Sequence, residues 1–237
     1  MMLALMAAAS GGCGGGRDVP TAEEIFSDAS AAALARAAAE GDTARIRRLV
    51  EGGADPNARG RSGVTVAQWA LLNQSAKGVA GLLENGADPS LPDSSGETVV
   101  HYAAKANDPK YLEVLLMHGA DPNTPHAVTG ATPLAPALLA TREIQFRRLL
   151  AAGADPNRTD RMGNTGLHLA AKILARPRVI DLLHAGADPR AVNRQGATFQ
   201  RYLLRPAKNL LTEDARRQQD SIEAWLRAHG VPLESAP

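Results

Sequence analysis

The stretch Gly119-Ala120-Asp121-Pro122 closes a leucine-rich segment, and the same four residues close four other segments of this 237-residue chain. The five copies begin at Gly53, Gly86, Gly119, Gly153 and Gly186, so successive copies are 33, 33, 34 and 33 residues apart. Composition alone does not produce so regular a period. It indicates one supersecondary unit copied head to tail, in which each copy needs its neighbours to bury its apolar face.

The copy over 91–123 is the most complete. It opens with Asp93-Ser94-Ser95-Gly96, a turn in which aspartate and glycine are favoured. Thr98 is well placed as the N-cap of a short first helix. The second helix carries leucines spaced three and four residues apart, which form one apolar stripe, and Gly119 ends it. The leucines are Leu112, Leu115 and Leu116.

Beyond these helix and turn signals, the chain resembles the ankyrin repeat family. The family pattern, a turn followed by T-P-L-H-x-A-A and a helix ending in L-L-x-x-G-A-D, is matched in register five times. A second marker agrees, because the turn glycines are 33, 34, 33 and 33 residues apart; they are Gly63, Gly96, Gly130, Gly163 and Gly196. The resemblance implies an all-α solenoid of about six stacked helix-turn-helix repeats with protruding β-turn loops. The repeats are expected at 28–57, 58–90, 91–123, 124–157, 158–190 and 191–237.

The last repeat departs from the pattern. Eleven extra residues lie between its helices, around Arg205–Thr212. A long charged helix over about 213–229 is expected to close the stack, with Ile222, Trp225 and Leu226 facing inward. Glu223 occupies the site that is apolar in earlier repeats, which suits the polar outer face that a terminal repeat needs.

The charge of the chain is nearly balanced, with 26 lysines and arginines against 25 aspartates and glutamates. This balance gives no reason to expect a nucleic acid partner. We expect one domain over 23–237 and a monomer.

The N-terminus differs in character from the repeats. Met1 to Ala9 form a short apolar run, followed by small residues and by Cys13, the single cysteine of the chain. This arrangement resembles a bacterial lipoprotein signal over 1–13, in which the cysteine is lipidated, with 14–22 as a flexible tether. It departs from that pattern at Ser10, where leucine is usual, and in having no basic residue near the start. The resemblance implies a periplasmic protein anchored to the outer membrane; an ordinary export signal and a cytoplasmic location remain alternatives.

No catalytic, cofactor or metal signature is present in the sequence. His101 and His168 occupy the T-P-L-H position, where the family uses the ring to tie repeats together through backbone hydrogen bonds. The other histidines lack the spacing of metal ligands. We therefore expect no enzyme, no cofactor and no metal. The alternative is an enzyme or small-ligand binder that uses the insertion at 205–212.

Function is then expected on a surface. The family binds partner proteins on its concave face, which is built from the turn tips and the exposed ends of the first helices. Transferred position by position, this implies a partner-binding set with an apolar strip at Leu72, Leu139 and Ile173. The partner-binding set consists of Arg59, Arg61, Leu72, Asp93, Glu97, Lys105, His126, Leu139, Arg161, Met162, Ile173 and Arg194.

An inhibitor or immunity protein for a secreted toxin is a narrower alternative for the function of this surface.

Overall fold

The computed structural model describes residues 20–204 and 208–234. These residues form thirteen α-helices and two short 3-10 helices, and they contain no β-strand. The prediction of an all-α repeat fold is confirmed. The leader over 1–13, Cys13 and most of the tether lie outside the described residues. Among the helices of the described part, none is long and apolar enough to cross a membrane.

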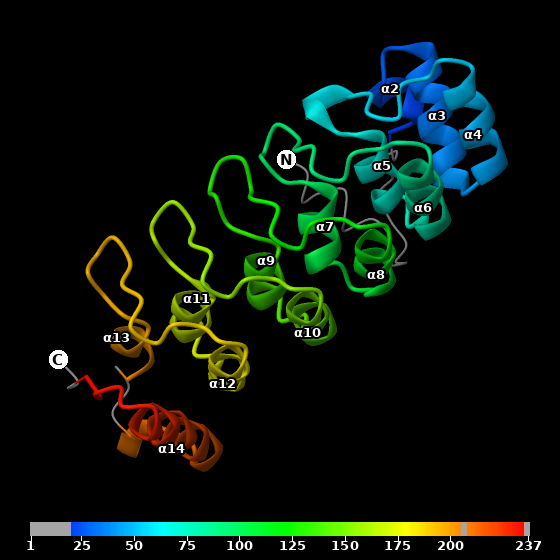
Figure 1. The fold of residues 1–237 in the computed structure, drawn as a ribbon. Coiled ribbons are helices and arrows are strands. Elements are labelled where there is room, and N and C mark those ends of the chain that lie inside the picture. Colours follow the sequence, from blue (N-terminus) through cyan, green and yellow to red (C-terminus); the bar gives the residue numbers. More distant parts are fainter. Residues whose placement is uncertain (1–19, 205–207, 235–237) are drawn as a thin grey trace, which may run out of the picture. The chain divides into compact units, whose positions relative to one another are not determined.

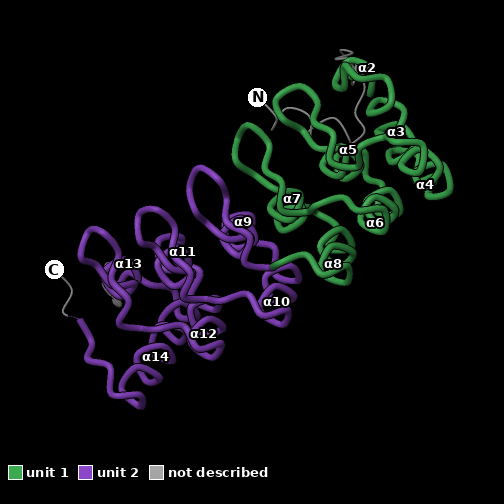
Figure 2. The backbone as a smooth tube through the Cα atoms, turned by 45° about the horizontal axis from the view of Figure 1, so that its top comes forward, with its two compact units in different colours: residues 1–121 green, residues 122–237 purple. Residues whose placement is uncertain are grey.

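The chain divides into two compact units, residues 1–121 and 122–237 (Figure 2). The division falls inside the third Gly-Ala-Asp-Pro turn, so each unit holds three of the six repeats. The helices of unit 1 are α2 (Ala22–Ile25), α3 (Ala29–Glu40), α4 (Thr43–Glu51), α5 (Val66–Leu72), α6 (Ala76–Glu84), α7 (Val99–Lys105) and α8 (Lys110–Met117). The helices of unit 2 are α9 (Leu134–Leu139), α10 (Glu143–Ala151), α11 (Gly166–Lys172), α12 (Arg176–His184), α13 (Gln200–Leu203) and α14 (Glu213–Ala228). The 3-10 helices are η2 (Arg61–Gly63) and η3 (Lys208–Leu210).

Within each unit the first helices of successive repeats lie side by side, and the second helices form an adjoining row (Figure 1). In unit 1 the first row is α3, α5 and α7. In unit 2 it is α9, α11 and α13. The loops that precede the first helices project from the same side of their unit (Figure 1).

The start of several first helices is set by a local capping motif. Thr65 and Gln68 form a capping box at α5, in which each side chain bonds the backbone N–H of the other. Thr98 with His101 and Thr165 with His168 do the same at α7 and α11. Because the motif needs residues only three positions apart, it is readable from the sequence.

The five repeated glycines end the second helices in the left-handed conformation that glycine adopts without a steric penalty. Their φ angles are 96° at Gly53, 89° at Gly86, 79° at Gly119, 88° at Gly153 and 87° at Gly186. The periodic motif is thus a helix stop followed by a turn.

One apolar position of the second helix supplies the core of every regular repeat. Side chains at this position lie in the interior of their unit. Full burial of such a side chain stabilises a fold by about 1.5–3 kcal/mol. The residues are Ile46, Val79, Leu112, Phe146 and Val179, each at most 1% exposed.

The closing repeat differs from its prediction at two residues. Ile222 and Leu226 of α14 are buried as expected, but Trp225 is only half-buried and stacks on His229. Glu223, expected on a polar outer face, is 6% exposed. Gln219 Nε2 and Arg227 Nη2 donate to its carboxylate at 3.3 and 3.2 Å. The residue is therefore a buried, hydrogen-bonded acid, because the carboxylate finds its partners along its own helix.

Candidate protein-binding surface

Successive loop tips are joined by backbone hydrogen bonds within each unit. The N–H of Ser94 donates to the carbonyl oxygen of Ser62 at 3.0 Å. In unit 2, Arg161 donates to Thr129 at 2.8 Å and Arg194 donates to Met162 at 3.0 Å. Each tip therefore holds its neighbour in place before any partner binds, which reduces the entropy that binding costs.

The predicted arginines lie at these tips and are all exposed. Arg59 Nη1 donates to the carbonyl oxygen of Pro92 at 2.6 Å, and Arg161 Nη2 donates to that of Ala127 at 2.9 Å. Each of these two guanidiniums also links its tip to a neighbouring loop. Arg61 and Arg194 make no side-chain hydrogen bond or ion pair within the described chain, so their guanidiniums are available to a partner.

Asp93 is not an exposed tip residue, contrary to its place in the predicted set. It is 5% exposed, and its Oδ1 accepts hydrogen bonds from the N–H of Ser95 at 2.8 Å and of Glu97 at 3.2 Å. Its Oδ2 accepts from the hydroxyl of Tyr102 at 2.8 Å. Both carboxylate oxygens are therefore hydrogen-bonded inside the protein, and the side chain is too buried to contact a partner.

Glu97 and Lys105 are half-buried and bind each other. Lys105 Nζ lies 2.6 Å from the Glu97 carboxylate and 4.4 Å from the centre of the Tyr102 ring. Burial, followed by the hydrogen bond to Asp93, raises the pKa of Tyr102, so its hydroxyl keeps its proton. This cluster fastens the third loop to the first helix that follows it.

His126 also works inside its loop. It is half-buried, and its Nδ1 accepts hydrogen bonds from the N–H groups of Val128 and Thr129 at 3.1 and 3.3 Å.

Met162 lies at the next tip and is 54% exposed. The apolar members of the unit 2 tips are thus Val128, Met162 and, at the last tip, Val192.

The predicted apolar strip differs between the units. In unit 2, Leu139 and Ile173 are 59% and 40% exposed at the ends of α9 and α11. In unit 1, Leu72 is half-buried at the end of α5. Exposed apolar contact surface of this kind is therefore a property of unit 2.

Sequence reasoning missed two exposed residues of the unit 2 loops, Arg158 and Val192. Val192 stands four residues before Gly196, as Arg59 stands four residues before Gly63. Its position in the repeat therefore matches that of a predicted binding residue and could have identified it from the sequence. Arg158 follows the fourth Gly-Ala-Asp-Pro-Asn turn directly, and its exposure was decided by the fold of the loop.

The histidines of the T-P-L-H position serve the scaffold. His168 Nε2 donates to the carbonyl oxygen of Ala197 at 2.9 Å, and its Nδ1 lies 2.9 Å from the Thr165 hydroxyl. Burial lowers the pKa of His168, which favours the neutral ring that these bonds require. Among the residues the structure describes, no group of three or more histidines, cysteines, aspartates or glutamates is placed to hold a metal ion.

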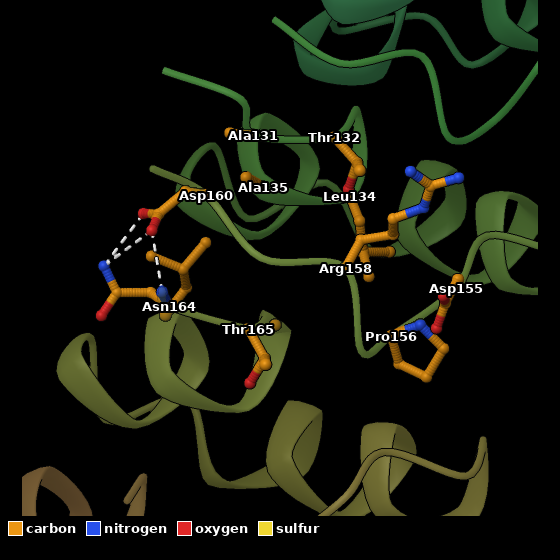
Figure 3. Close-up of a pocket in the computed structure, with 12 residues that line it drawn as sticks. Ala131, Thr132, Leu134, Ala135, Asp155, Pro156, Arg158, Asp160, Asn164 and Thr165 are labelled. Atoms are coloured by element: carbon orange, nitrogen blue, oxygen red, sulfur yellow. Dashed lines mark hydrogen bonds between the residues drawn. The ribbon is translucent and has the colours of Figure 1, made fainter. Parts of the chain in front are cut away.

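A pocket between the fourth and fifth repeats is too small for a substrate. Its cavity volume is about 10 Å³, about the minimum for one water molecule. Figure 3 shows Asp160 and Asn164 at its edge, joined by the hydrogen bonds that build the fifth loop. The insertion at 205–212, which would hold the ligand in the alternative interpretation, falls partly outside the described residues.

The comparisons agree with this geometry. A family model described as "Ankyrin repeats (3 copies)" matches residues 34–126 and 100–193. Protein PhlB of Serratia liquefaciens is 45% identical over 157 residues, which is 64% of this chain and 66% of PhlB, slightly under two thirds of that relative.

Two solved structures have the same fold. The ankyrin repeat domain of Bcl-3, a member of the IkappaB protein family, gives a TM-score of 0.68 at 26% identity, covering 79% of this chain and 81% of that domain. An ankyrin repeat domain from Acinetobacter baumannii AYE gives a TM-score of 0.67 at 27% identity, covering 84% and 98% of the two chains. The family model matches more than half of the chain, and the helix pairs and joined loop tips have the geometry described above. This chain therefore belongs to the ankyrin repeat family.

Proposed function

We propose that the chain is a non-enzymatic protein-interaction module that binds an acidic partner protein. The contact surface consists of the loop tips and first-helix ends of each unit, the face that forms the concave groove in this family. Ankyrin repeats in general bind other proteins, and the fold supports that general function. The partner's charge is inferred from the tips themselves.

One observation carries this proposal: the tip carboxylates accept hydrogen bonds or pair with a cation inside the loops, whereas three exposed loop arginines have no such side-chain partner among the described residues. Asp93 and Asp160 accept backbone N–H groups of their own turns, and Glu97 is paired with Lys105. Arg61, Arg158 and Arg194 have no side-chain partner within the described chain. The tips therefore present unneutralised positive charge beside exposed apolar side chains, Met162 among them, a combination suited to a protein interface.

Charge reversal tests the surface. Arg61→Glu with Arg194→Glu is expected to reduce capture of the partner in a crosslinked cell envelope at least tenfold, without a change in helical content. The matched control is Arg47→Glu with Lys77→Glu, two exposed basic residues on second helices. Equal capture by both double variants would remove the tips from the interface. Arg59 and Arg161 are avoided because their side chains also hold neighbouring loops.

The N-terminal sequence supports a second part of the proposal, a lipid anchor at Cys13 that holds the module on the periplasmic side of the outer membrane. Changing Cys13 to serine should then move the protein from the membrane fraction to the soluble fraction of its native host. Unchanged fractionation would count against the anchor and leave the binding surface untouched. An inhibitor of a secreted toxin is the special case in which the captured acidic partner is an exported effector.

A further inference from the structure

A cleft in unit 2 lies away from the loop tips, on the edge where the two helices of a repeat are joined. It opens between the end of α9 and the starts of α10 and α12, with a volume of about 260 Å³. Leu138 and Phe146 form an apolar floor, and both are nearly fully buried. Glu143 and Arg178 line the rim and pair with each other. The space is close to the lower size limit of known ligand pockets, and its apolar floor suits one hydrophobic group.

Exposed apolar side chains flank this cleft in unit 2. Ile144 is 52% exposed at the start of α10, and Leu174 is 42% exposed just before α12. In the two regular repeats of unit 1, the position of Ile144 is filled by Lys77 and Lys110 and that of Leu174 by Gln74 and Asn107. At these two positions unit 1 carries only polar residues, whereas the fourth and fifth repeats of unit 2 each carry one exposed apolar side chain.

The starts of α4 and α6 in unit 1 differ from those of α10 and α12 in unit 2, whereas α8 of unit 1, with Pro109 at its N-cap, also lacks a side-chain cap. In unit 1, Asp42 caps α4 by accepting the N–H of Arg45 at 2.9 Å, and Ser75 caps α6 by accepting the N–H of Gly78 at 3.1 Å. The equivalent residues of unit 2 are Arg142 and Ala175, and neither α10 nor α12 has a side-chain cap. An uncapped helix start favours a negative group supplied from outside the helix.

Arg176 is the first residue of α12 and is 4% exposed. Within the described part of the chain it pairs with no acidic side chain, and its buried Nε and Nη2 have no hydrogen-bond partner there. These two N–H groups form one edge of the guanidinium, which matches the two oxygens of a carboxylate. The acids of the two edge segments, Glu143 and Asp181, are both held by Arg178.

The two segments, 139–148 and 172–181, together carry six basic and two acidic residues. A buried and unpaired charge is strongly unfavourable, and arginine cannot relieve it by losing its proton. Rotation of the Arg176 side chain toward the edge, where it meets a carboxylate, would remove that cost.

We propose that this inter-helix edge is a second docking surface, which binds a partner segment carrying an apolar residue close to an acidic one. The apolar side chain fills the cleft between α9, α10 and α12. The carboxylate pairs with Arg176 beside the uncapped start of α12. A nucleic acid would supply the negative charge but no aliphatic group for the apolar floor. The proposal is independent of the loop-tip surface.

Selection of a phage-displayed library of random twelve-residue peptides on the purified full chain tests it. The enriched peptides are expected to share a Leu, Ile, Phe or Met within three positions of an Asp or Glu. Their affinity is then measured by fluorescence anisotropy for the wild type and for two variants. Ala175→Asp places a cap and a negative charge at the start of α12, and Arg176→Met removes the cation.

Both variants are expected to weaken the peptides at least tenfold while raising the melting temperature, since one adds a helix cap and the other removes a buried unpaired charge. Ser75→Asp adds the negative charge at the equivalent position of unit 1, where a cap already exists, and should leave the affinity unchanged. The proposal is overturned by peptides without the acidic and apolar pair, by affinities that the two variants leave unchanged, or by loss of binding in the Arg61→Glu, Arg194→Glu variant. Binding of a labelled oligonucleotide that Arg176→Met abolishes would also overturn it in favour of a nucleic acid.

Discussion

The ring of His168 donates from Nε2 to the carbonyl oxygen of Ala197 across 2.9 Å, and this bond joins the fifth repeat to the loop of the sixth. In the second repeat, Gln68 Nε2 donates to the carbonyl oxygen of Glu97 at 2.7 Å over the same separation of 29 residues. Both side chains also close a capping box with a threonine three residues earlier. Histidine and glutamine are therefore interchangeable here by function, because each offers one donor and one acceptor at the required places.

This equivalence predicts a matched pair of variants. His168→Gln should lower the free energy of unfolding by about 1 kcal/mol or less, because the amide can remake both bonds. His168→Leu should cost about 1–3 kcal/mol, because it leaves buried polar groups unpaired. Urea unfolding followed by circular dichroism measures both. Equal losses in the two variants would contradict the assigned role of the ring.

The pH dependence of stability follows from the same residue. Burial lowers the pKa of His168 in the folded chain, whereas the unfolded chain titrates near the ordinary value of 6.5. Below that value the unfolded chain takes up a proton that the folded chain resists. The stabilisation is therefore complete above about pH 6.5 and is lost as the pH falls toward the folded-state pKa. Unfolding free energies at several pH values, for the wild type and His168→Gln, should diverge below this point in favour of the variant.

Leu174 adopts a left-handed backbone conformation with a φ of 55°. The equivalent Gly41 has a φ of 72° in the first repeat, where glycine carries no steric penalty. Leu174→Gly should therefore raise the unfolding free energy by about 1 kcal/mol through relief of this strain. Leu174→Ala is the control, because it shortens the side chain and keeps the strained backbone. A variant with glycine that is no more stable than the alanine variant would refute the strain argument.

Gly78 of α6 is a close-packing position. A Cβ atom there would lie 1.8 Å from the carbonyl oxygen of Ala38 in α3, so even alanine forces the two helices apart. Gly78→Ala should lower the unfolding free energy by about 1–3 kcal/mol or more. Gly52→Ala at the exposed end of α4, whose Cβ would lie 3.2 Å from the nearest atom, should have a smaller effect. A melting temperature for the Gly78 variant equal to that of the wild type would show that these helices are less closely packed.

The sequence by itself determined the repeat architecture, because each of its signals is local. The capping boxes join residues three apart, as Thr165 and His168 show, and the helix stop at Gly119 depends on a single backbone angle. The apolar stripe that includes Leu112 follows from the 3.6-residue period of the helix. Copying these signals every 33 or 34 residues repeats one helix pair, whatever the exposed positions contain.

Only the tertiary structure decided which exposed positions form a surface. Asp93 and Arg61 both belong to loop tips, yet one turns inward to the Tyr102 hydroxyl and the other stays free. Glu223 is buried, although its place in the repeat predicted an exposed outer face. Leu139 is more exposed than Leu72, although the two residues occupy equivalent positions in their repeats. The physical reason is that burial and pairing depend on groups contributed by neighbouring loops and helices, and a side chain's own position in the repeat does not specify them.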